Sequence, residues 1–265
     1  MNSVDSGESK FGFAPSLVDL LCPQAERQGA ARLYWFQEAT AAAQDDARCL
    51  PAQFRAQVAR TPDAEAVVGD DETLTYAELD ARSDALAWHL REQGVAPDVR
   101  VGLKVERSTG MVVALLGILK AGGACVSLDP DTSPEQLAAL LEDAQLRVFV
   151  TQSHRDLAPG TQGVRTVFVD SEEAFQLRVL GPPRAGTTPE GIASVRYTAG
   201  TTGQPRGEPL SHLGVSRFFN DLDARLGHAP VGTRLEVSRR ACGGSVLELL
   251  WALLRGFRVQ VRDAV

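Results

Sequence analysis

The chain has 265 residues, of which 44% are hydrophobic and 23% are charged. This composition indicates a globular protein that is long enough for one large domain or two small ones. The formal net charge is -7, and the Lys and Arg residues are scattered without forming a basic face, which argues against nucleic acid as a partner.

The sequence also argues against a membrane span and a metal site. The longest apolar runs, such as Met111 to Leu119, are too short to cross a bilayer, and residues 1–9 show no signal region. We therefore expect no membrane partner and a cytoplasmic location. The cysteines are widely separated and lack a nearby His at ligand spacing, which favours reduced thiols over a zinc site or disulfides. They are Cys22, Cys49, Cys125 and Cys242.

From about residue 66, short β-branched runs alternate with helical patterns, which predicts an α/β fold of βαβ units around a largely parallel sheet. Helix boundaries are marked by capping residues. Thr75 and Glu78 form a capping box, and Gly94 stands where that helix would end. Ser108 and Ser133 are the expected N-caps of two further helices, which end near Lys120 and Ala144.

Capping residues, turn residues and β-branched runs also indicate the positions of the strands and of the later helices. The expected strands are 99–105, 124–128, 148–150, 166–169, 192–198, 234–238 and 258–261, and the later helices are 213–226 and 245–254. A turn-rich connector covers about 172–190. Residues 1 to about 50 differ in composition, and we expect at most short helices there, at 16–21 and 32–40.

A loop of glycines and hydroxyls closed by one cation, Tyr197 to Gly207, is the most informative stretch. Glycines let the backbone approach a ligand, the adjacent threonines supply hydroxyl donors, and Arg206 supplies a fixed charge for phosphate oxygens. The loop is neither a Walker A loop nor a Gly-x-Gly-x-x-Gly motif. The pattern predicts a phosphate cradle, and a Gly/Pro turn that joins two strands is an equally open interpretation.

Several motifs occur in an order and at a spacing that resemble one family, the adenylation domains of nonribosomal peptide synthetases, which are adenylate-forming enzymes. The motifs are Leu74 to Leu79, Leu119 to Pro130 and the loop 197–207, with further similarity at Ala59 to Ala64 and Leu141 to Ala144. The resemblance implies the first subdomain of that fold. It divides the chain into a segment at 1–50 that resembles a condensation-adenylation linker and a truncated adenylation-like domain at 51–265.

The resemblance implies a chemistry in which ATP and Mg²⁺ activate an amino acid. The carboxylate attacks the α-phosphate, which gives an aminoacyl-adenylate and pyrophosphate, and a carrier-protein thiol then takes the acyl group. Condensation and carrier-protein domains are therefore the implied partners. The residues at the family's nucleotide-binding positions are Thr198, Gly200, Thr201, Thr202, Gly203, Arg206, Gly207 and His212. No catalytic or metal-binding residue is assigned to this chain.

The chain departs from the family pattern at several positions. Arg206 replaces the usual Lys and keeps the charge, Ala199 replaces a Ser, and Cys125 and Ser127 replace a Tyr and a Pro in a stretch that we interpret as structural. The largest departure lies at Cys242 and Gly243, where the family has a Phe-Asp pair. That aspartate pairs with the substrate's α-ammonium, and a buried ammonium without a counter-charge is strongly disfavoured.

If residue 265 ends the natural protein, the later family motifs and the catalytic Lys have no counterpart, and adenylation by this chain alone is not expected. The incomplete fold would leave a sheet edge to be covered by a partner, by self-association or by rearrangement. We therefore expect a truncated, catalytically inactive adenylation-like domain that serves as a structural or protein-interaction module. The alternatives are a fragment that becomes active when its missing half is supplied and a nucleotide-binding module without chemistry.

Overall fold

The computed structural model describes residues 49–70, 72–129, 132–153, 163–175, 181–183, 186–199, 205–226, 234–236 and 244–261. The strands are β1 (Glu65–Val68), β2 (Thr73–Thr75), β3 (Arg100–Leu103), β4 (Ala124–Ser127), β5 (Val148–Thr151), β6 (Arg165–Phe168), β7 (Ile192–Ala199), β8 (Pro205–Ser211), β9 (Arg234–Glu236) and β10 (Arg258–Gln260). The helices are α3 (Leu50–Arg60), α4 (Tyr76–Glu92), α5 (Thr109–Ala121), α6 (Pro134–Asp143), α7 (His212–Leu226) and α8 (Gly244–Leu254), with a 3-10 turn, η2, at Glu172–Phe175.

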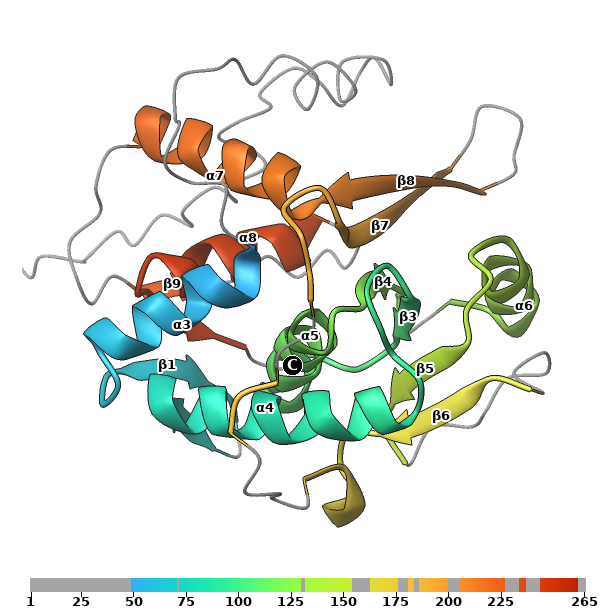
Figure 1. The fold of residues 1–265 in the computed structure, drawn as a ribbon, viewed down its shortest axis with the longest axis horizontal. Helices are drawn as coiled ribbons and strands as arrows, with labels where there is room; N and C mark the ends of the chain where they lie inside the picture. The colour runs from blue at the N-terminus through green and yellow to red at the C-terminus, as the bar shows by residue number, and fades with distance from the viewer. Residues whose placement is uncertain are drawn as a thin grey trace, which may run out of the picture.

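The strands form two separate sheets (Figure 1). The larger sheet has the order β6-β5-β3-β4-β7-β8, and all its neighbours run parallel except β7 and β8. The smaller sheet has the order β2-β1-β10-β9, in which only β1 and β2 are antiparallel. The predicted α/β class with a largely parallel sheet is confirmed. The division of the strands between two sheets was not predicted, because hydrophobic periodicity does not say which strands pair.

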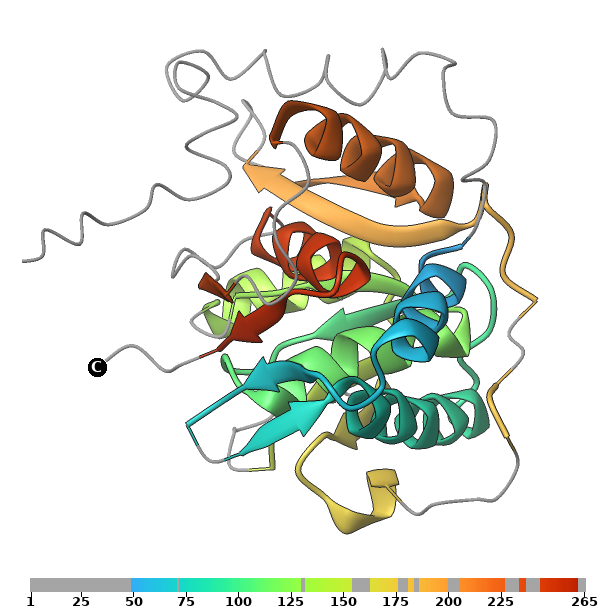
Figure 2. The same ribbon diagram turned by 90° about the vertical axis from the view of Figure 1, so that its left-hand side faces the viewer.

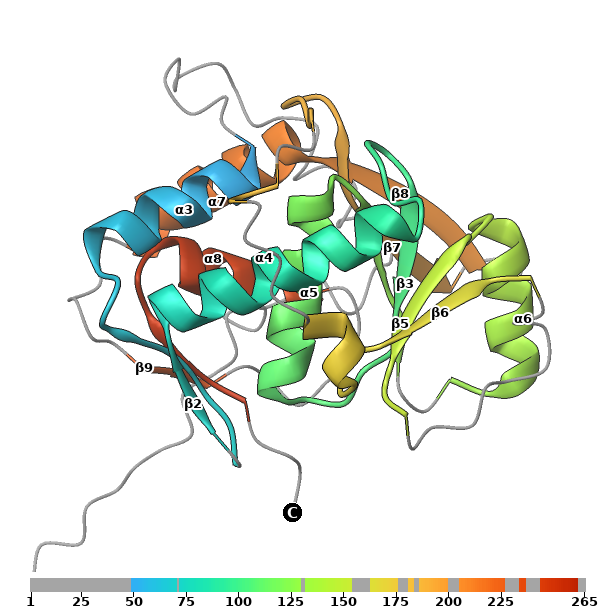
Figure 3. The same cartoon turned by 60° about the horizontal axis from the view of Figure 1, so that its bottom comes forward.

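A layer of helices lies between the two sheets. In Figure 3, α4, α5 and α8 lie between the smaller sheet and the larger sheet, α3 packs beside them, and α6 lies on the opposite side of the larger sheet; Figure 2 shows the molecule from the side of the smaller sheet. The main core joins this helix layer to both sheets, and α5 contributes almost all of its side chains to it. A second core fills the space between α6 and the larger sheet. The helix α7 lies beside β7 and β8.

Local capping explains why the helices begin where they do. The backbone N–H of Glu78 donates to the Thr75 hydroxyl at 3.2 Å, and the Glu78 carboxylate accepts from the Thr75 backbone N–H at 2.8 Å, which completes the predicted capping box. Ser108 and Ser133 accept from the third backbone N–H of α5 and α6. Gly122 adopts a φ of 95° after α5, a conformation that favours glycine. The three predicted N-caps are therefore confirmed.

Several elements are absent from the predicted set. Residues 50–60 form the helix α3, residues 65–68 and 73–75 form the strands β1 and β2, and residues 205–211 form the strand β8 between the loop and the predicted helix at 213–226. The strand β8 contains two prolines and a glycine, so its strand conformation depends on pairing with β7 rather than on propensity. The predicted helices at 16–21 and 32–40 lie outside the described residues.

Within the ranges given above, no helix combines the length and the apolar composition that a membrane span requires.

Candidate functional site

The predicted phosphate loop connects the two strands of a hairpin. The strands β7 and β8 pair in antiparallel register as far as Thr198 with Arg206 and Ala199 with Pro205. The five residues 200–204 that join these ends, which include the predicted ligands Gly200, Thr201, Thr202 and Gly203, lie outside the described residues. The structure therefore shows that the loop joins two paired strands, an arrangement compatible with a phosphate cradle as well as with a plain turn.

The hairpin brings three of the predicted residues together. Thr198 lies on β7 opposite Arg206, and Gly207 is the next residue of β8. These residues stand beyond the carboxyl end of β4, because β7 runs parallel to β4 and its ladder with β4 ends at Val195. The carboxyl edge of a parallel sheet is where open α/β folds bind ligands. The position of these strand ends fits the proposed contact with a phosphate.

Gly207 has a packing role that the sequence did not reveal. It pairs with Tyr197 across the hairpin, and a Cβ atom at Gly207 would lie 2.9 Å from Cζ of Tyr197 and 3.0 Å from its hydroxyl oxygen. Real Cβ atoms do not approach other atoms so closely, so any larger residue would displace the tyrosine ring. The glycine thus leaves room for the ring of Tyr197, whatever ligand the hairpin contacts.

His212 is separated from the other predicted ligands. It begins α7 at the far end of β8, six residues from Arg206, which corresponds to about 20 Å of strand. Its side chain is fully buried, and its Nδ1 accepts a hydrogen bond from the backbone N–H of Leu50 at 3.3 Å. His212 thus connects α7 to the start of α3, and its expected contact with a nucleotide stays a prediction.

The charge state of His212 agrees with this structural position. Burial lowers the pKa of its imidazole to about 4, although the carboxylate of Asp98 opposes the shift. The side chain is therefore neutral at pH 7, with its proton on Nε2, because Nδ1 acts as the acceptor. A neutral, buried imidazole is a poor partner for a phosphate anion.

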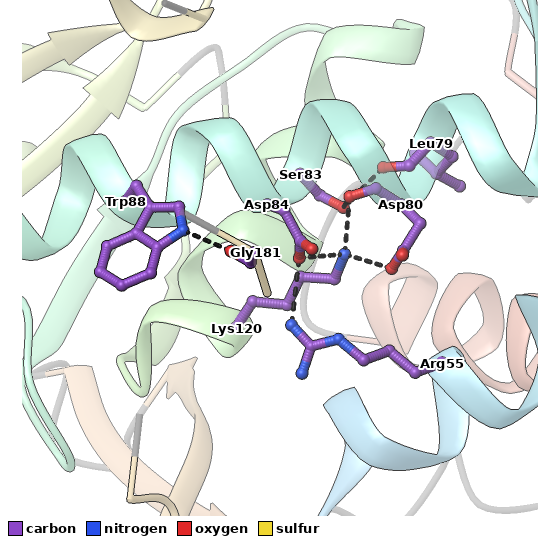
Figure 4. A network of polar contacts seen from close by, with 8 residues as sticks. All are labelled: Arg55, Leu79, Asp80, Ser83, Asp84, Trp88, Lys120 and Gly181. Carbon is purple, nitrogen blue, oxygen red and sulfur yellow. Dashed lines mark hydrogen bonds and ion pairs between the residues drawn. The ribbon is translucent and has the colours of Figure 1, made fainter. Parts of the chain in front are cut away.

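A second motif of the family, which includes Lys120, forms an ionic junction between helices (Figure 4). Nζ of Lys120 lies 2.6 Å from Oδ1 of Asp80 and 2.8 Å from Oδ1 of Asp84, and it donates to the backbone oxygen of Asp80 at 2.9 Å. Asp84 also accepts from Arg55 of α3 at 3.1 Å. The three ammonium donors of Lys120 therefore all have acceptors.

The environment of Lys120 is structural. Its side chain is fully buried, and its ammonium lies 5.3 Å from the centre of the Phe54 ring. Burial lowers the pKa of this lysine, whereas the two carboxylates raise it. With both carboxylates in contact, we expect the charged form, and the junction joins α3, α4 and α5.

Cys125, which replaces a Tyr of the family pattern, is also part of the interior. It lies in β4 and is fully buried, and burial raises the pKa of its thiol to about 12. A thiol with so high a pKa is unreactive at neutral pH. Within the described residues, Cys49 and Cys125 are free thiols.

Sequence reasoning missed two residues beside the hairpin. The hydroxyl of Tyr197 donates to Oδ2 of Asp143, the last residue of α6, at 2.6 Å. Both residues stood within motifs that resemble the family, but nothing in their spacing indicated that they would meet. The carboxylates of Asp80 and Asp84 were also missed, although their spacing of four residues on one helix was a visible signal.

Within the part of the chain that the structure describes, no three or more His, Cys, Asp or Glu side chains are arranged to hold a metal ion.

Comparison with known proteins identifies the family. The model of the family described as AMP-binding enzyme matches residues 54–264. Malpinin synthetase of Mortierella alpina is 37% identical over 223 residues, which cover 84% of this chain and 3% of that protein. Tyrocidine synthase 3 of Brevibacillus parabrevis is 35% identical over 243 residues, or 90% of this chain and 4% of that protein. The chain thus spans a very small part of these relatives.

Solved structures agree with this assignment. The nonribosomal peptide synthetase FmoA3, in its AMPPNP-bound form, is similar with a TM-score of 0.74 and 31% identity, over 88% of this chain and 25% of that chain. The N-terminal subdomain of Klebsiella oxytoca NpsA, in complex with 3-hydroxybenzoyl-AMSN, has a TM-score of 0.70 and 22% identity, over 82% and 54% of the two chains. This second likeness shows the fold alone.

The family match covers most of the chain, and the order of motifs, the parallel sheet and the hairpin all agree with it. The chain therefore belongs to the AMP-binding enzyme family, and it corresponds to the amino-terminal part of the adenylate-forming fold found in nonribosomal peptide synthetases.

Proposed function

We propose that this chain is an adenylation-like module of a nonribosomal peptide synthetase that retains a phosphate-binding hairpin but does not itself activate an amino acid. One observation carries the proposal. Gly243 stands where the family resemblance places the aspartate that pairs with the substrate's α-ammonium. Without a carboxylate, a bound amino acid would leave its ammonium without a counter-charge, at a cost of several kcal/mol.

The hairpin supports the retained phosphate contact. Thr198 and Arg206 are paired across β7 and β8, which puts a threonine and an arginine on adjacent strand ends. A guanidinium is always charged and presents a planar set of donors that matches two phosphate oxygens. These residues, with Gly200, Thr201, Thr202, Gly203 and Gly207 of the same stretch, form the proposed site for the phosphates of ATP. His212 is not part of this set because of its distance and burial.

The chemical role of such a site in an active relative would be to hold negative charge. When a carboxylate attacks the α-phosphate of ATP, charge moves to the departing pyrophosphate, and fixed donors near it stabilise the transition state. In this chain the same donors would bind the nucleotide without completing the reaction. The module would then serve the assembly through its structure and its contacts with neighbouring domains.

The proposed partners are the condensation and carrier-protein domains of a synthetase. The support is indirect, since the similar proteins named above are synthetases of which this chain matches 3–4%. The helix α3 begins at Leu50, close to the proposed boundary between a condensation-adenylation linker at 1–50 and the module at 51–265. A cytoplasmic location and self-association through a sheet edge remain further parts of the proposal.

The test is ATP-pyrophosphate exchange across a pool of amino acids. The chain is assayed alone and together with a carboxy-terminal half from an active relative, and gel filtration shows that the two parts have assembled. We expect no exchange in either sample. The matched control is Gly243→Asp in the same assembly, which returns the carboxylate and is expected to raise exchange. Robust exchange by the unaltered chain, alone or assembled, would overturn the proposal of inactivity.

A second function is favoured by the hairpin itself. The pairing of Thr198 with Arg206 is compatible with an enzyme fragment that activates an amino acid once the carboxy-terminal half of the domain is supplied. The same assay separates the two functions. Exchange in the assembled sample alone would identify the chain as one part of a working enzyme, whose substrate does not use the ammonium contact at position 243.

A further inference from the structure

One tyrosine joins the hairpin to a helix on the outer face of the larger sheet. The hydroxyl of Tyr197 on β7 donates to Oδ2 of Asp143 at 2.6 Å, and Asp143 is the last residue of α6. The ring packs against the core between α6 and the sheet, beside Val195. Tyr197 therefore combines an apolar contact with a hydrogen bond to a carboxylate, which is stronger than one between neutral groups.

The residue opposite Tyr197 leaves room for its ring. Gly207 is the cross-strand partner of Tyr197, and a Cβ atom there would lie only 2.9 Å from the ring. Burial and the nearby Asp143 carboxylate both raise the pKa of the Tyr197 phenol, so its proton remains available to donate at neutral pH. The three residues thus form one unit across β7, β8 and α6, which we name the Tyr197 anchor.

The Tyr197 anchor lies where the hairpin leaves the larger sheet. The ladder between β4 and β7 pairs Cys125 with Ser194 and Val126 with Val195, and it ends there. The hairpin continues beyond this point to the pairs at Thr198 and Ala199. Among the described strands, β8 pairs only with β7, so the hairpin beyond Val195 has no backbone pairing with the rest of the sheet (Figure 1). The bond to Asp143 ties this extension to α6.

We propose that Tyr197 is a positioning residue for nucleotide binding. Its hydrogen bond to Asp143, for which Gly207 leaves room, fixes the ends of β7 and β8. Thr198 and Arg206 lie on these strand ends. This inference rests on the proposed function and deepens it, since it names what orients the phosphate-binding residues. A hydroxyl and a guanidinium bind an anion well only when their geometry is fixed before the ligand arrives.

The first experiment measures ATP affinity by equilibrium dialysis. The variants are Tyr197→Phe, which keeps the ring and removes the hydroxyl, Asp143→Ala, and the two combined. We expect each single variant to bind ATP about fivefold more weakly, because the strand ends are less well ordered. The double variant should be no weaker than either single variant, because both remove the same bond.

The matched control is Tyr76→Phe. The Tyr76 hydroxyl is buried on α4 and bonds to the backbone oxygens of Leu253 and Phe257, at 3.0 and 2.9 Å, far from the hairpin in sequence. Its removal should lower the thermal midpoint more than Tyr197→Phe does, since the hydroxyl proton that two buried carbonyl oxygens share is lost. The ATP affinity of this control should stay unchanged. If Tyr197 contributed to stability alone, Tyr197→Phe would lower the thermal midpoint and leave the ATP affinity unchanged.

A second readout does not depend on ATP. Hydrogen exchange measured by mass spectrometry should be faster in 192–199 and 205–211 of Tyr197→Phe, and unchanged in 100–103 and 148–151 of the central strands. If the unaltered chain does not bind ATP, the proposed phosphate site fails, and this readout alone decides whether the anchor orders the hairpin. Equal ATP affinity together with equal exchange in Tyr197→Phe and the unaltered chain would overturn the inference.

Discussion

The Lys120 junction and the end of the β7–β8 hairpin both come from motifs that resemble the adenylation family. Lys120 is fully buried, whereas Tyr197 and Gly207 of the hairpin are half-buried. The Lys120 ammonium has two carboxylates and a backbone oxygen around it. The hairpin end extends beyond the backbone pairing of β7 with the sheet, and Tyr197 connects it to α6. A cation in the first place joins helices, whereas Arg206 in the second remains a candidate for an external anion.

This difference shows that a residue's place in a family motif does not tell whether it stabilises the fold or contacts a ligand. Its burial and its neighbours in the structure decide that. His212 and Lys120 both occupy family motifs and both carry ionisable groups, yet each is buried and joined to α3 or its neighbours. Substitution of His212 or Lys120 is therefore expected to change the free energy of unfolding. Residues of the hairpin end should instead affect ligand affinity, and the following predictions separate the two kinds of effect.

The largest expected loss of stability follows from a substitution of Lys120. Lys120→Met keeps most of the side-chain volume but removes the charge between Asp80 and Asp84. We expect the free energy of unfolding to fall by about 4 kcal/mol, as when one partner of a buried ion pair is removed. Urea denaturation measures this change in the free energy of unfolding. The control Arg82→Met, which removes an exposed ion pair with Glu72, should cost less than about 1 kcal/mol, and equal losses would contradict a special role for Lys120.

The next effect concerns pH and His212. Its pKa in the folded state is lowered from 6.5 to about 4, so the unfolded chain binds a proton more readily in this range. The free energy of unfolding should therefore fall as pH drops from about 6.5 to about 4, by about 3 kcal/mol in total. His212→Asn keeps an acceptor for the Leu50 N–H and cannot titrate. Denaturation curves of the two proteins across this range should diverge, and parallel curves would contradict the assignment.

A smaller effect is expected at Gly207. In Gly207→Ala the added methyl meets the Tyr197 ring, and such overpacking should lower the free energy of unfolding by about 2 kcal/mol. The control is Gly110→Ala in α5, where the nearest atom to the new Cβ lies at an ordinary 3.5 Å and alanine favours the helix. Thermal denaturation compares them. A loss at Gly110 as large as that at Gly207 would show that the ring contact is not the cause.

Local signals in the sequence predicted much of the fold. Thr75, Ser108 and Ser133 bond to backbone groups three residues away, so the sequence alone contains the information for these helix starts. Strand β8 was missed because its two prolines and its glycine oppose a strand, and only pairing with β7 stabilises it. The split into two sheets was missed for the same reason, since pairing between distant strands is not written in local periodicity.

The candidate site was predictable only in part. The glycines, threonines and Arg206 indicated a phosphate contact, and the structure places Thr198, Arg206 and Gly207 together at one end of a hairpin. The separation of His212 was not predictable, because a strand between the two positions carries it about 20 Å away. The bond from Tyr197 to Asp143 was also invisible, since these residues are 54 positions apart and meet through tertiary packing.

The most direct test of the account is the ATP affinity of the chain and of Arg206→Ala, with Arg217→Ala on the exposed face of α7 as the control. The account predicts that the unaltered chain and the control bind ATP equally and that Arg206→Ala binds about fivefold more weakly, which corresponds to about 1 kcal/mol. Equal affinity in all three proteins, or no binding by the unaltered chain at millimolar ATP, would contradict the claim that the hairpin retains a phosphate site.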